Sequence, residues 1–173
     1  MPTRAATTLP GSILGRKLGR IMLIVATAGL IVIALLVTVL WLLSPGKVQP
    51  LTGQDGKPLP DSIAEKIFVP INGVQQGMFI KSTDERNPVL LFLHGGPGMP
   101  EYFLTRDTPT GLEEDFTVVW WEQRGAGLSY SPEIQPESLT IEQLIADTIA
   151  VTDYLRSRFG VEKIYLMGHS GGS

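Results

Sequence analysis

Residues Ile21 to Leu43 form a run of 23 residues that contains no charged side chain. About 20 consecutive apolar residues are enough to cross the hydrocarbon core of a bilayer as a helix. The run is apolar on every face of such a helix, whereas a helix on a soluble domain keeps its apolar residues on one side. It therefore predicts a single transmembrane anchor, with membrane lipid as its partner.

The charges that flank this run predict its orientation. Four cations precede it and one follows closely: Arg4, Arg16, Lys17 and Arg20 against Lys47. Because positively charged flanks stay on the cytoplasmic side, residues 1–20 are expected to be a cytoplasmic tail and the later residues to lie outside the cytoplasm.

The alternative is a cleaved signal peptide. Such a peptide has an apolar region of about 7–15 residues that ends at a small-x-small cleavage site. The run here is longer, and Trp41 to Pro45 is a poor cleavage site, so an uncleaved anchor is favoured.

Charge and composition exclude several classes of protein. The net charge is −3 and the pI is about 5.4, which gives no case for a nucleic-acid partner, since that partner needs a clustered basic face. The chain has no cysteine, so disulfides, thiol catalysis and zinc–thiolate sites are excluded. We expect neither a metal ion nor a cofactor, and the oligomeric state is left open.

The residues after the anchor fall into two parts. Residues 44–62 are rich in glycine and proline and are expected to be a linker with little regular structure. Residues 63–173 are expected to form an α/β domain. Within it, Ile63 to Val69 and Val74 to Lys81 fit two strands joined by a turn at Asn72-Gly73.

Three further segments have the continuous apolar character of strands that are buried on both faces, as in a parallel sheet. They are Val89 to Leu93, Phe116 to Trp121 and Lys163 to Met167. A less regular helix is expected within Glu101 to Leu112.

A longer helix is predicted between the last two strands. Thr140 with Gln143 forms a capping-box pattern at its start, and Gly160 is a C-cap at its end. Strand, helix and strand in this order form a βαβ unit, which implies a parallel sheet. We expect seven residues at helical spacing to face the core: Ile141, Leu144, Ile145, Thr148, Ile149, Thr152 and Leu155.

The sequence Gly168-His169-Ser170-Gly171-Gly172 follows directly on the last strand and matches G-x-S-x-G. In a nucleophile elbow the serine sits at the tip of a strained strand-to-helix turn, where neighbouring side chains would clash. Gly168 and Gly172 remove those side chains. A plain glycine-rich turn is the weaker explanation, so Ser170 is predicted to be a nucleophile, with the Gly171 N–H as one oxyanion donor.

A second glycine-rich loop, His94-Gly95-Gly96-Pro97-Gly98, also follows a buried strand. Glycines here allow a backbone N–H to point into a cavity. We expect the second oxyanion donor to be Gly95 or Gly96, and the sequence does not choose between them. A phosphate-binding loop is disfavoured by Pro97 and by the absence of a following G-K-S/T.

The chain contains only two histidines, His94 and His169. His169 adjoins Ser170 and is expected to point elsewhere on the elbow, and His94 is expected to make structural hydrogen bonds in its loop. In this type of site the order is serine, then an acid, then histidine, so both partners are expected beyond residue 173. The chain is therefore expected to be the N-terminal half of an enzyme, truncated after the elbow and inactive alone.

Together these residues resemble the prolyl iminopeptidase-like branch of the α/β-hydrolases, peptidase family S33. The landmarks are the two glycine motifs and, between them, Trp121 to Ser129, which includes Glu122, Gln123 and Arg124. Glu122 replaces the aspartate usual in the family, and Gly171 replaces a frequent tryptophan.

The resemblance implies an α/β-hydrolase fold, with the N-terminal half of a mostly parallel sheet after one transmembrane helix. It also implies an aminopeptidase that releases N-terminal residues, proline above all, from peptides through an acyl-enzyme. An esterase or lipase-like hydrolase and an inactive truncated membrane protein are the alternatives. Glu122, Gln123 and Arg124 are expected to support the active-site loops, Arg124 through a salt bridge, although a plain surface arginine is the alternative for it.

Overall fold

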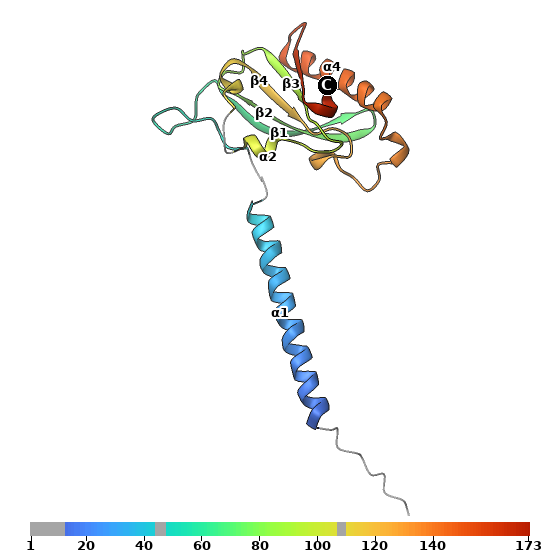
Figure 1. Ribbon diagram of the computed structural model, residues 1–173. Coiled ribbons are helices and arrows are strands. Elements are labelled where there is room, and N and C mark those ends of the chain that lie inside the picture. Colours follow the sequence, from blue (N-terminus) through green and yellow to red (C-terminus); the bar gives the residue numbers. More distant parts are fainter. Residues whose placement is uncertain (1–12, 44–47, 107–109) are drawn as a thin grey trace, which may run out of the picture. The chain divides into compact units, whose positions relative to one another are not determined.

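A computed structural model describes residues 13–43, 48–106 and 110–173 (Figure 1). The chain divides into two compact units, residues 1–46 and residues 47–173. Each is described by itself below, and the second is called the α/β unit.

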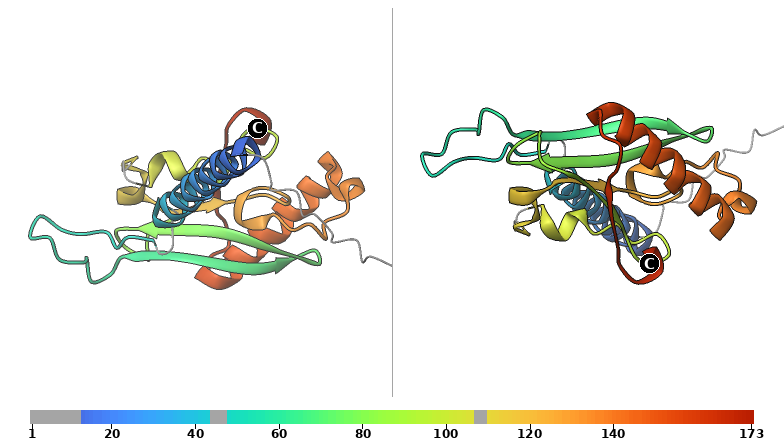
Figure 2. Two further views of the ribbon diagram at one scale, coloured as in Figure 1. Left: turned by 90° about the horizontal axis from the view of Figure 1, so that it is seen from below. Right: turned by 90° about the horizontal axis from the view of Figure 1, so that it is seen from above.

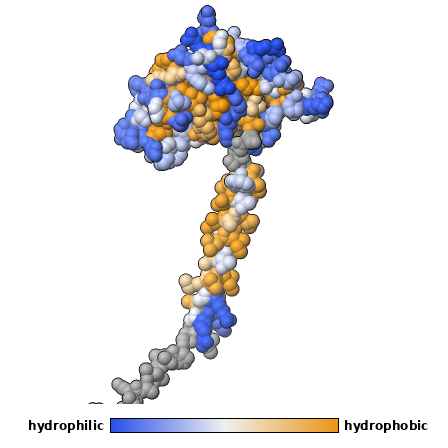
Figure 3. All heavy atoms as spheres, turned by 180° about the vertical axis from the view of Figure 1, so that it is seen from behind, coloured by the Kyte–Doolittle hydropathy of each residue, from blue (hydrophilic) through white to orange (hydrophobic). Residues whose placement is uncertain are grey.

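The first unit contains one helix, α1, over Ile13–Leu43. Its described side chains are exposed, and apolar residues cover it, with hydrophilic residues at its N-terminal end (Figure 3). The hydroxyls of Thr27 and Thr38 each donate to a backbone carbonyl one turn earlier at 2.8 Å, so these polar groups are satisfied within the helix. Residues Gly15–Leu42 are long and apolar enough to cross a membrane, and a signal sequence near an N-terminus meets the same criteria.

The α/β unit is built on a five-stranded sheet with the order β1-β2-β4-β3-β5. The β1–β2 and β2–β4 pairs are antiparallel, and the β3–β4 and β3–β5 pairs are parallel. The sheet is therefore mixed, with an antiparallel hairpin at one edge and three parallel strands at the other. The strands are β1 (Ile63–Ile71), β2 (Val74–Ser82), β3 (Val89–Leu93), β4 (Thr117–Trp121) and β5 (Tyr165–Gly168).

The predicted hairpin is present. Ile71 pairs with Val74 across a two-residue turn. Asn72 and Gly73 have φ values of 45° and 80°, the positive pair that a type I′ turn requires.

The predicted long helix is α4, over Ile141–Phe159. The Thr140 side chain accepts from the Gln143 N–H at 3.2 Å, and Gly160 ends the helix with a φ of 64°. The helix connects β4 to β5, and β3 lies between these two strands in the sheet. In place of one helix over Glu101 to Leu112, there are two short ones, α2 (Tyr102–Thr105) and α3 (Leu112–Asp115), and residues 107–109 lie outside the described ranges.

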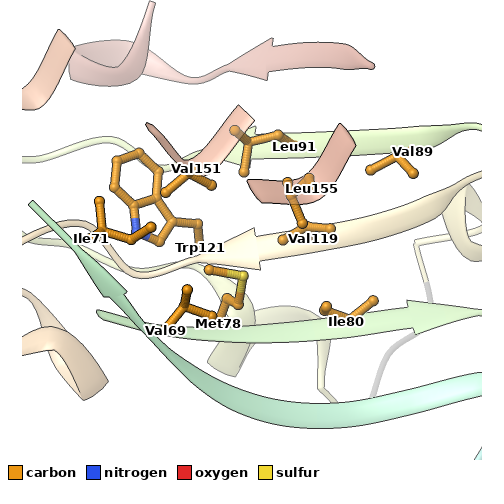
Figure 4. Close-up of a cluster of buried hydrophobic side chains, with 10 residues drawn as sticks. All are labelled: Val69, Ile71, Met78, Ile80, Val89, Leu91, Val119, Trp121, Val151 and Leu155. Atoms are coloured by element: carbon orange, nitrogen blue, oxygen red, sulfur yellow. The ribbon is translucent and has the colours of Figure 1, made fainter. Parts of the chain in front are cut away.

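Strand residues alternate strictly between two cores. Met78, Ile80, Leu91, Val119 and Trp121 face one side of the sheet, where Val151 and Leu155 of α4 cover them (Figure 4). Phe79, Leu90, Phe92, Val118 and Trp120 face the other side, where they meet Tyr102 of α2. The unit is thus a three-layer α/β fold, with α4 on one face and the short helices on the other (Figure 2).

The predicted core face of α4 was partly wrong. Ile141, Ile145 and Ile149 are exposed, whereas the buried residues of the helix are Asp147, Val151 and Leu155. The helix is rotated so that the Asp147 carboxylate faces the sheet and its hydrogen-bond donors. A helix with two apolar stripes can bury either one, and the polar contacts of Asp147 decide which stripe packs here.

Strand β5 also differs from the prediction. All four of its residues are exposed, including Tyr165, Leu166 and Met167, although the apolar run predicted a strand buried on both faces. Among the described residues, β5 pairs on one side only, with β3, and it forms the edge of the sheet. Its apolar character is therefore not matched by burial in this unit.

Residues 48–62 of the expected linker contain neither a helix nor a ladder strand. They fold into a small turn closed by an isolated bridge between Thr52 and Pro58, with the Leu59 N–H donating to the Leu51 carbonyl at 2.9 Å. Residues 44–47 lie outside the described residues.

Candidate active site

The three sequence motifs lie at the carboxyl ends of three neighbouring parallel strands. Strand β3 leads into His94 to Gly98, β4 into Glu122 to Arg124, and β5 into the elbow around Ser170. Leu93 pairs with Trp121 on one side and with Gly168 on the other, so the three loops start level with one another. Clefts beyond the carboxyl ends of parallel strands are the usual ligand sites of α/β sheets.

Ser170 lies at the tip of a tight turn between β5 and the 3-10 helix η3 (Ser170–Gly172), near the C-terminal end marked in Figure 1. Its φ is 52°, and of the described residues other than glycine only Asn72 shares a positive φ. A positive φ is costly for a residue with a side chain, and such strain collects at functional sites.

The glycines around the serine are required by close backbone contacts. A Cβ on Gly168 would lie 2.4 Å from the Gly172 carbonyl oxygen, and a Cβ on Gly172 would lie 2.3 Å from that of Leu93. The turn is further fixed by the His169 N–H, which donates to Leu93 at 3.1 Å, and by the Gly172 N–H, which donates to His169 at 2.9 Å. The elbow is therefore held against the end of β3 by backbone atoms.

The loop after β3 lies directly against this turn. A Cβ on Gly95 would lie 3.1 Å from the Ser170 Cβ, and a Cβ on Gly171 would lie 3.6 Å from the Gly96 nitrogen. Gly96 has a φ of 136°, which only glycine adopts readily. In the described part of the chain, no hydrogen bond occupies the N–H of Gly95, Gly96 or Gly171.

His94 is buried at the start of this loop and makes structural hydrogen bonds. Its Nε2 accepts from the Gln123 N–H at 3.0 Å, so Nδ1 carries the proton and donates to the Gly95 carbonyl at 2.8 Å. The Gln123 side-chain amide donates to the His94 carbonyl at 3.1 Å. Burial lowers the pKa of His94, which keeps the ring neutral in this arrangement.

His169 pairs with an acidic side chain beside the glycine loop. Its Nδ1 contacts the Glu101 carboxylate, which follows the glycine loop, and its side chain is largely exposed. Within the described residues, neither histidine hydrogen-bonds to the Ser170 hydroxyl.

Arg124 is buried in an ion pair and is not a surface arginine. Its Nε and Nη2 donate to the two carboxylate oxygens of Asp147 at 2.8 and 3.0 Å, and the two side chains are 8% and 0% exposed. Asn72, Gln76 and Gln143 donate to the same carboxylate, each at 2.8 Å. Burial alone would raise the pKa of Asp147, but these donors outweigh it and hold the pKa below its usual range.

Sequence reasoning missed Asp147. The available signal was an acid within an apolar stripe of a helix, because Leu144, Asp147 and Val151 follow one another at helical spacing. A charged residue on the core face of a helix requires buried partners, and Arg124 is the main one.

Glu122 occupies the family's aspartate position and is also buried. Its carboxylate accepts from the Leu128 N–H, and its carbonyl accepts from the Ser129 hydroxyl. Burial raises the pKa of Glu122, and the Leu128 N–H and the charge of Lys66 oppose this only in part. The carboxylate thereby closes the loop that follows β4.

A cavity of about 410 Å³ lies beside these loops. It is lined by the His94–Gly98 loop, by residues 123–125, by residues 138–141 and Leu144 at and before the start of α4, and by Gly171. The described residues contain no group of three or more acidic or histidine side chains that is able to hold a metal ion.

Comparison with known proteins agrees with this architecture. A family model described as the alpha/beta hydrolase fold matches residues 88–173. The chain belongs to the α/β-hydrolase superfamily. Its curated relatives include a probable aminopeptidase, YbaC, from Bacillus subtilis, 48% identical over 116 residues, and a proline iminopeptidase from Thermoplasma volcanium, 33% identical over 111 residues. These names confirm the resemblance predicted from the three motifs.

The α/β-hydrolase chain covers only part of each relative. The two alignments span 67% and 64% of this chain and 36% of each relative, so the chain spans little more than a third of their length. A proline iminopeptidase-related protein from Thermus thermophilus has a TM-score of 0.53 at 32% identity over 64% of this chain and 37% of its own. An epoxide hydrolase from Vigna radiata has a TM-score of 0.51 at 31% identity over 63% of this chain and 32% of its own.

Proposed function

We propose that the chain carries the nucleophile and the oxyanion donors of a serine hydrolase, and that the complete enzyme is an aminopeptidase of the proline iminopeptidase type. The observation that carries the proposal is the positive φ of Ser170 at a strand-to-helix turn whose flanking glycines admit no side chain. A serine presented in this way projects its hydroxyl toward substrate, as a nucleophile requires.

In this proposal Ser170 attacks a substrate carbonyl, and the resulting oxyanion accepts hydrogen bonds from two backbone N–H groups. Gly171 supplies one, because it follows the nucleophile and no hydrogen bond from the described residues occupies its N–H. Gly96 is the better candidate for the other, because its nitrogen lies near Gly171 whereas Gly95 packs on the Ser170 Cβ. One such donor contributes about 2.7–4 kcal/mol to stabilisation of the transition state.

The proton of the Ser170 hydroxyl requires a base that the described residues do not contain. His94 has both ring nitrogens occupied, and His169 contacts Glu101. In this fold the acid and the histidine of the triad follow the serine in the chain. We expect them in the sequence that follows residue 173 in the complete protein.

The substrate proposal rests on the relatives. The B. subtilis relative is named a probable aminopeptidase and the T. volcanium relative a proline iminopeptidase. By analogy the substrate is a peptide with a free amino terminus, proline first. An ester substrate is the competing proposal for the same serine.

The test uses the protein expressed from its complete coding sequence. We expect cleavage of a proline arylamide to exceed that of a short-chain nitrophenyl ester, and Ser170→Ala to abolish both cleavage and fluorophosphonate labelling. Ester turnover without arylamide cleavage would overturn the peptidase assignment. Full labelling of Ser170→Ala would overturn the nucleophile.

A polypeptide of residues 1–173 provides a further test. We expect it to show no fluorophosphonate labelling, because both histidines are committed to other contacts. Labelling of Ser170 in this polypeptide would show that the site needs no downstream base.

Helix α1 is proposed to be an uncleaved membrane anchor with its N-terminus in the cytoplasm. Its length and its basic N-terminal end support this proposal. N-terminal sequencing of the mature protein is expected to find residues that precede α1. A mature N-terminus near residues 45–50 would instead identify a cleaved signal sequence.

A further inference from the structure

The Asp147 carboxylate lies at the centre of a buried polar network that joins three separate elements. Asn72 and Gln76 come from the hairpin, Gln143 from α4 and Arg124 from the loop after β4, and all four donate to Asp147. The carboxylate is fully buried and accepts five hydrogen bonds from these side chains. No ligand or substrate is needed to explain its charge, because Arg124 neutralises it.

The network continues toward the oxyanion loop. Gln76 also accepts a hydrogen bond from the Trp121 indole N–H at 2.9 Å. Because Gln76 donates to Asp147, this bond connects the end of β4 to the Asp147 network. Arg124 follows Gln123 in the chain, and Gln123 makes two hydrogen bonds to His94. Its backbone N–H donates to the His94 ring at Nε2, and its side-chain amide donates to the His94 carbonyl. His94 in turn donates to the Gly95 carbonyl.

Each step of this route is a hydrogen bond or a single peptide link. Among the described residues, no hydrogen bond occupies the Gly95 or Gly96 N–H, and the Met99 N–H donates to the Gly95 carbonyl at 3.3 Å. The loop also packs against the elbow, where Gly95 lies beside Ser170. The position of the Gly96 N–H therefore depends in part on His94, which the Gln123–Arg124 segment holds and which Asp147 reaches through Arg124.

We propose that Asp147 is a positioning residue for catalysis, which sets the oxyanion loop through Arg124, Gln123 and His94. The proposal rests on the proposed function, because it assigns a role in aligning that site. Asp147 touches no reacting atom, and its effect on turnover is indirect. A small displacement of a catalytic group lowers turnover by up to about 100-fold.

The principal test is Asp147→Asn in the protein expressed from its complete coding sequence. The amide keeps the shape of the carboxylate but removes the charge and turns an NH₂ group toward the donors of Arg124. We expect kcat per fluorophosphonate-titrated Ser170 to fall by about 10- to 100-fold, with KM changed by less than about threefold. A purely structural role would reduce the number of titratable sites and leave kcat per site unchanged.

Two further variants keep the test decisive. Gln123→Ala removes the side-chain hydrogen bond to the His94 carbonyl and leaves the backbone N–H bond to the ring and the Asp147 contacts in place, and it is expected to reproduce part of the loss of kcat with little loss of stability. Asp153→Asn on the same helix is the matched control, because Asp153 is exposed and pairs with Arg156 at the surface. Wild-type kcat per site in both Asp147→Asn and Gln123→Ala would overturn the proposal.

Hydrogen exchange separates this proposal from the proposed function. In Asp147→Asn, exchange of the Gln123 and Met99 amides, which donate to the His94 ring and to the Gly95 carbonyl, is expected to rise by about tenfold relative to Asp153→Asn, whether or not Ser170 is a nucleophile. Unchanged exchange over these residues would overturn the positioning role. A wild-type protein whose Ser170 does not label would overturn the proposed function and leave this result standing.

Discussion

Strands β2, β3 and β4 are largely buried between side chains of the α/β unit, whereas every residue of the neighbouring edge strand β5 is exposed. The first region has two apolar cores and the Asp147 network. The second region carries Ser170 directly after β5. Backbone pairing with β3 and close contacts at the elbow glycines attach this region to the rest of the sheet. Among the described residues, the apolar cores lie on the buried strands, and the candidate nucleophile follows the exposed edge strand.

The largest expected effect is on the first region, strands β2, β3 and β4 with the Asp147 network, which we call the closed region. Asp147→Ala leaves the Arg124 charge buried without its partner, and loss of one member of a buried ion pair costs about 3–5 kcal/mol. We expect chemical denaturation of the full chain in detergent to show this loss in the α/β unit. Asp153→Ala, at an exposed pair on the same helix, is expected to change the free energy of unfolding by less than about 1 kcal/mol.

The same residue gives a pH signature. The pKa of Asp147 is below its usual value in the folded protein, so its contribution to stability is present above the unfolded pKa near 3.8 and is lost as the pH falls through the folded pKa. Asp147→Asn is expected to flatten the acid limb of the stability profile. An acid limb identical to that of the wild type would show that the pair does not contribute there.

The second expected effect compares one substitution in the two regions. Leu155 is 0% exposed in α4, and Leu166 is 55% exposed in β5. Truncation of a buried leucine costs about 2–5 kcal/mol, because transfer free energy is lost and a cavity is left. In the polypeptide of residues 1–173, we expect Leu155→Ala to lower the free energy of unfolding by this amount and Leu166→Ala by less than about 1 kcal/mol. Equal losses would mean that β5 is buried in the protein as tested.

The sequence predicted most elements of the closed region because their signals are local. The continuous apolar runs of β3 and β4, the Asn72-Gly73 turn and the Thr140 and Gly160 caps each depend on a few neighbouring residues. The orientation of α4 was not predictable in the same way, because Ile141, Ile145 and Ile149 form an apolar stripe as regular as the buried one. The donors that settle the choice, Asn72 and Arg124, are distant in the sequence.

The candidate site was predicted unevenly for the same reason. The two glycine motifs identify Ser170 and its surrounding loops, since their spacing reports local backbone geometry. The Asp147 network joins the hairpin, the loop after β4 and α4, and it has no contiguous pattern in the sequence. The exposure of β5 was also missed, because an apolar run predicts burial without specifying what covers the strand.

The third expected effect is at the junction of the two regions. A Cβ on Gly172 would lie 2.3 Å from the Leu93 carbonyl oxygen and 2.8 Å from that of His94, so Gly172→Ala forces the elbow away from β3. We expect a loss of about 1–3 kcal/mol, as for other overpacked sites, and loss of fluorophosphonate labelling in the complete protein. Gly29→Ala in α1, where no atom lies within 4 Å, is the matched control and is expected to change neither quantity. Normal labelling of Gly172→Ala would show that the elbow tolerates a shift.

The smallest expected effect concerns Glu122. This residue directly follows β4, where the closed region ends. Burial raises its pKa in the folded protein, so its contribution to stability is present below the unfolded pKa near 4.5 and is lost as the pH rises through the folded pKa. Glu122→Gln keeps an acceptor for the Leu128 N–H and removes the buried charge. We expect its free energy of unfolding at neutral pH to equal or exceed that of the wild type by up to about 1 kcal/mol, with a flatter profile above pH 4.5. A marked loss of stability at neutral pH would show instead that the charged carboxylate is needed to close this loop, and would extend the closed region as far as η1 (Gly127–Ser129).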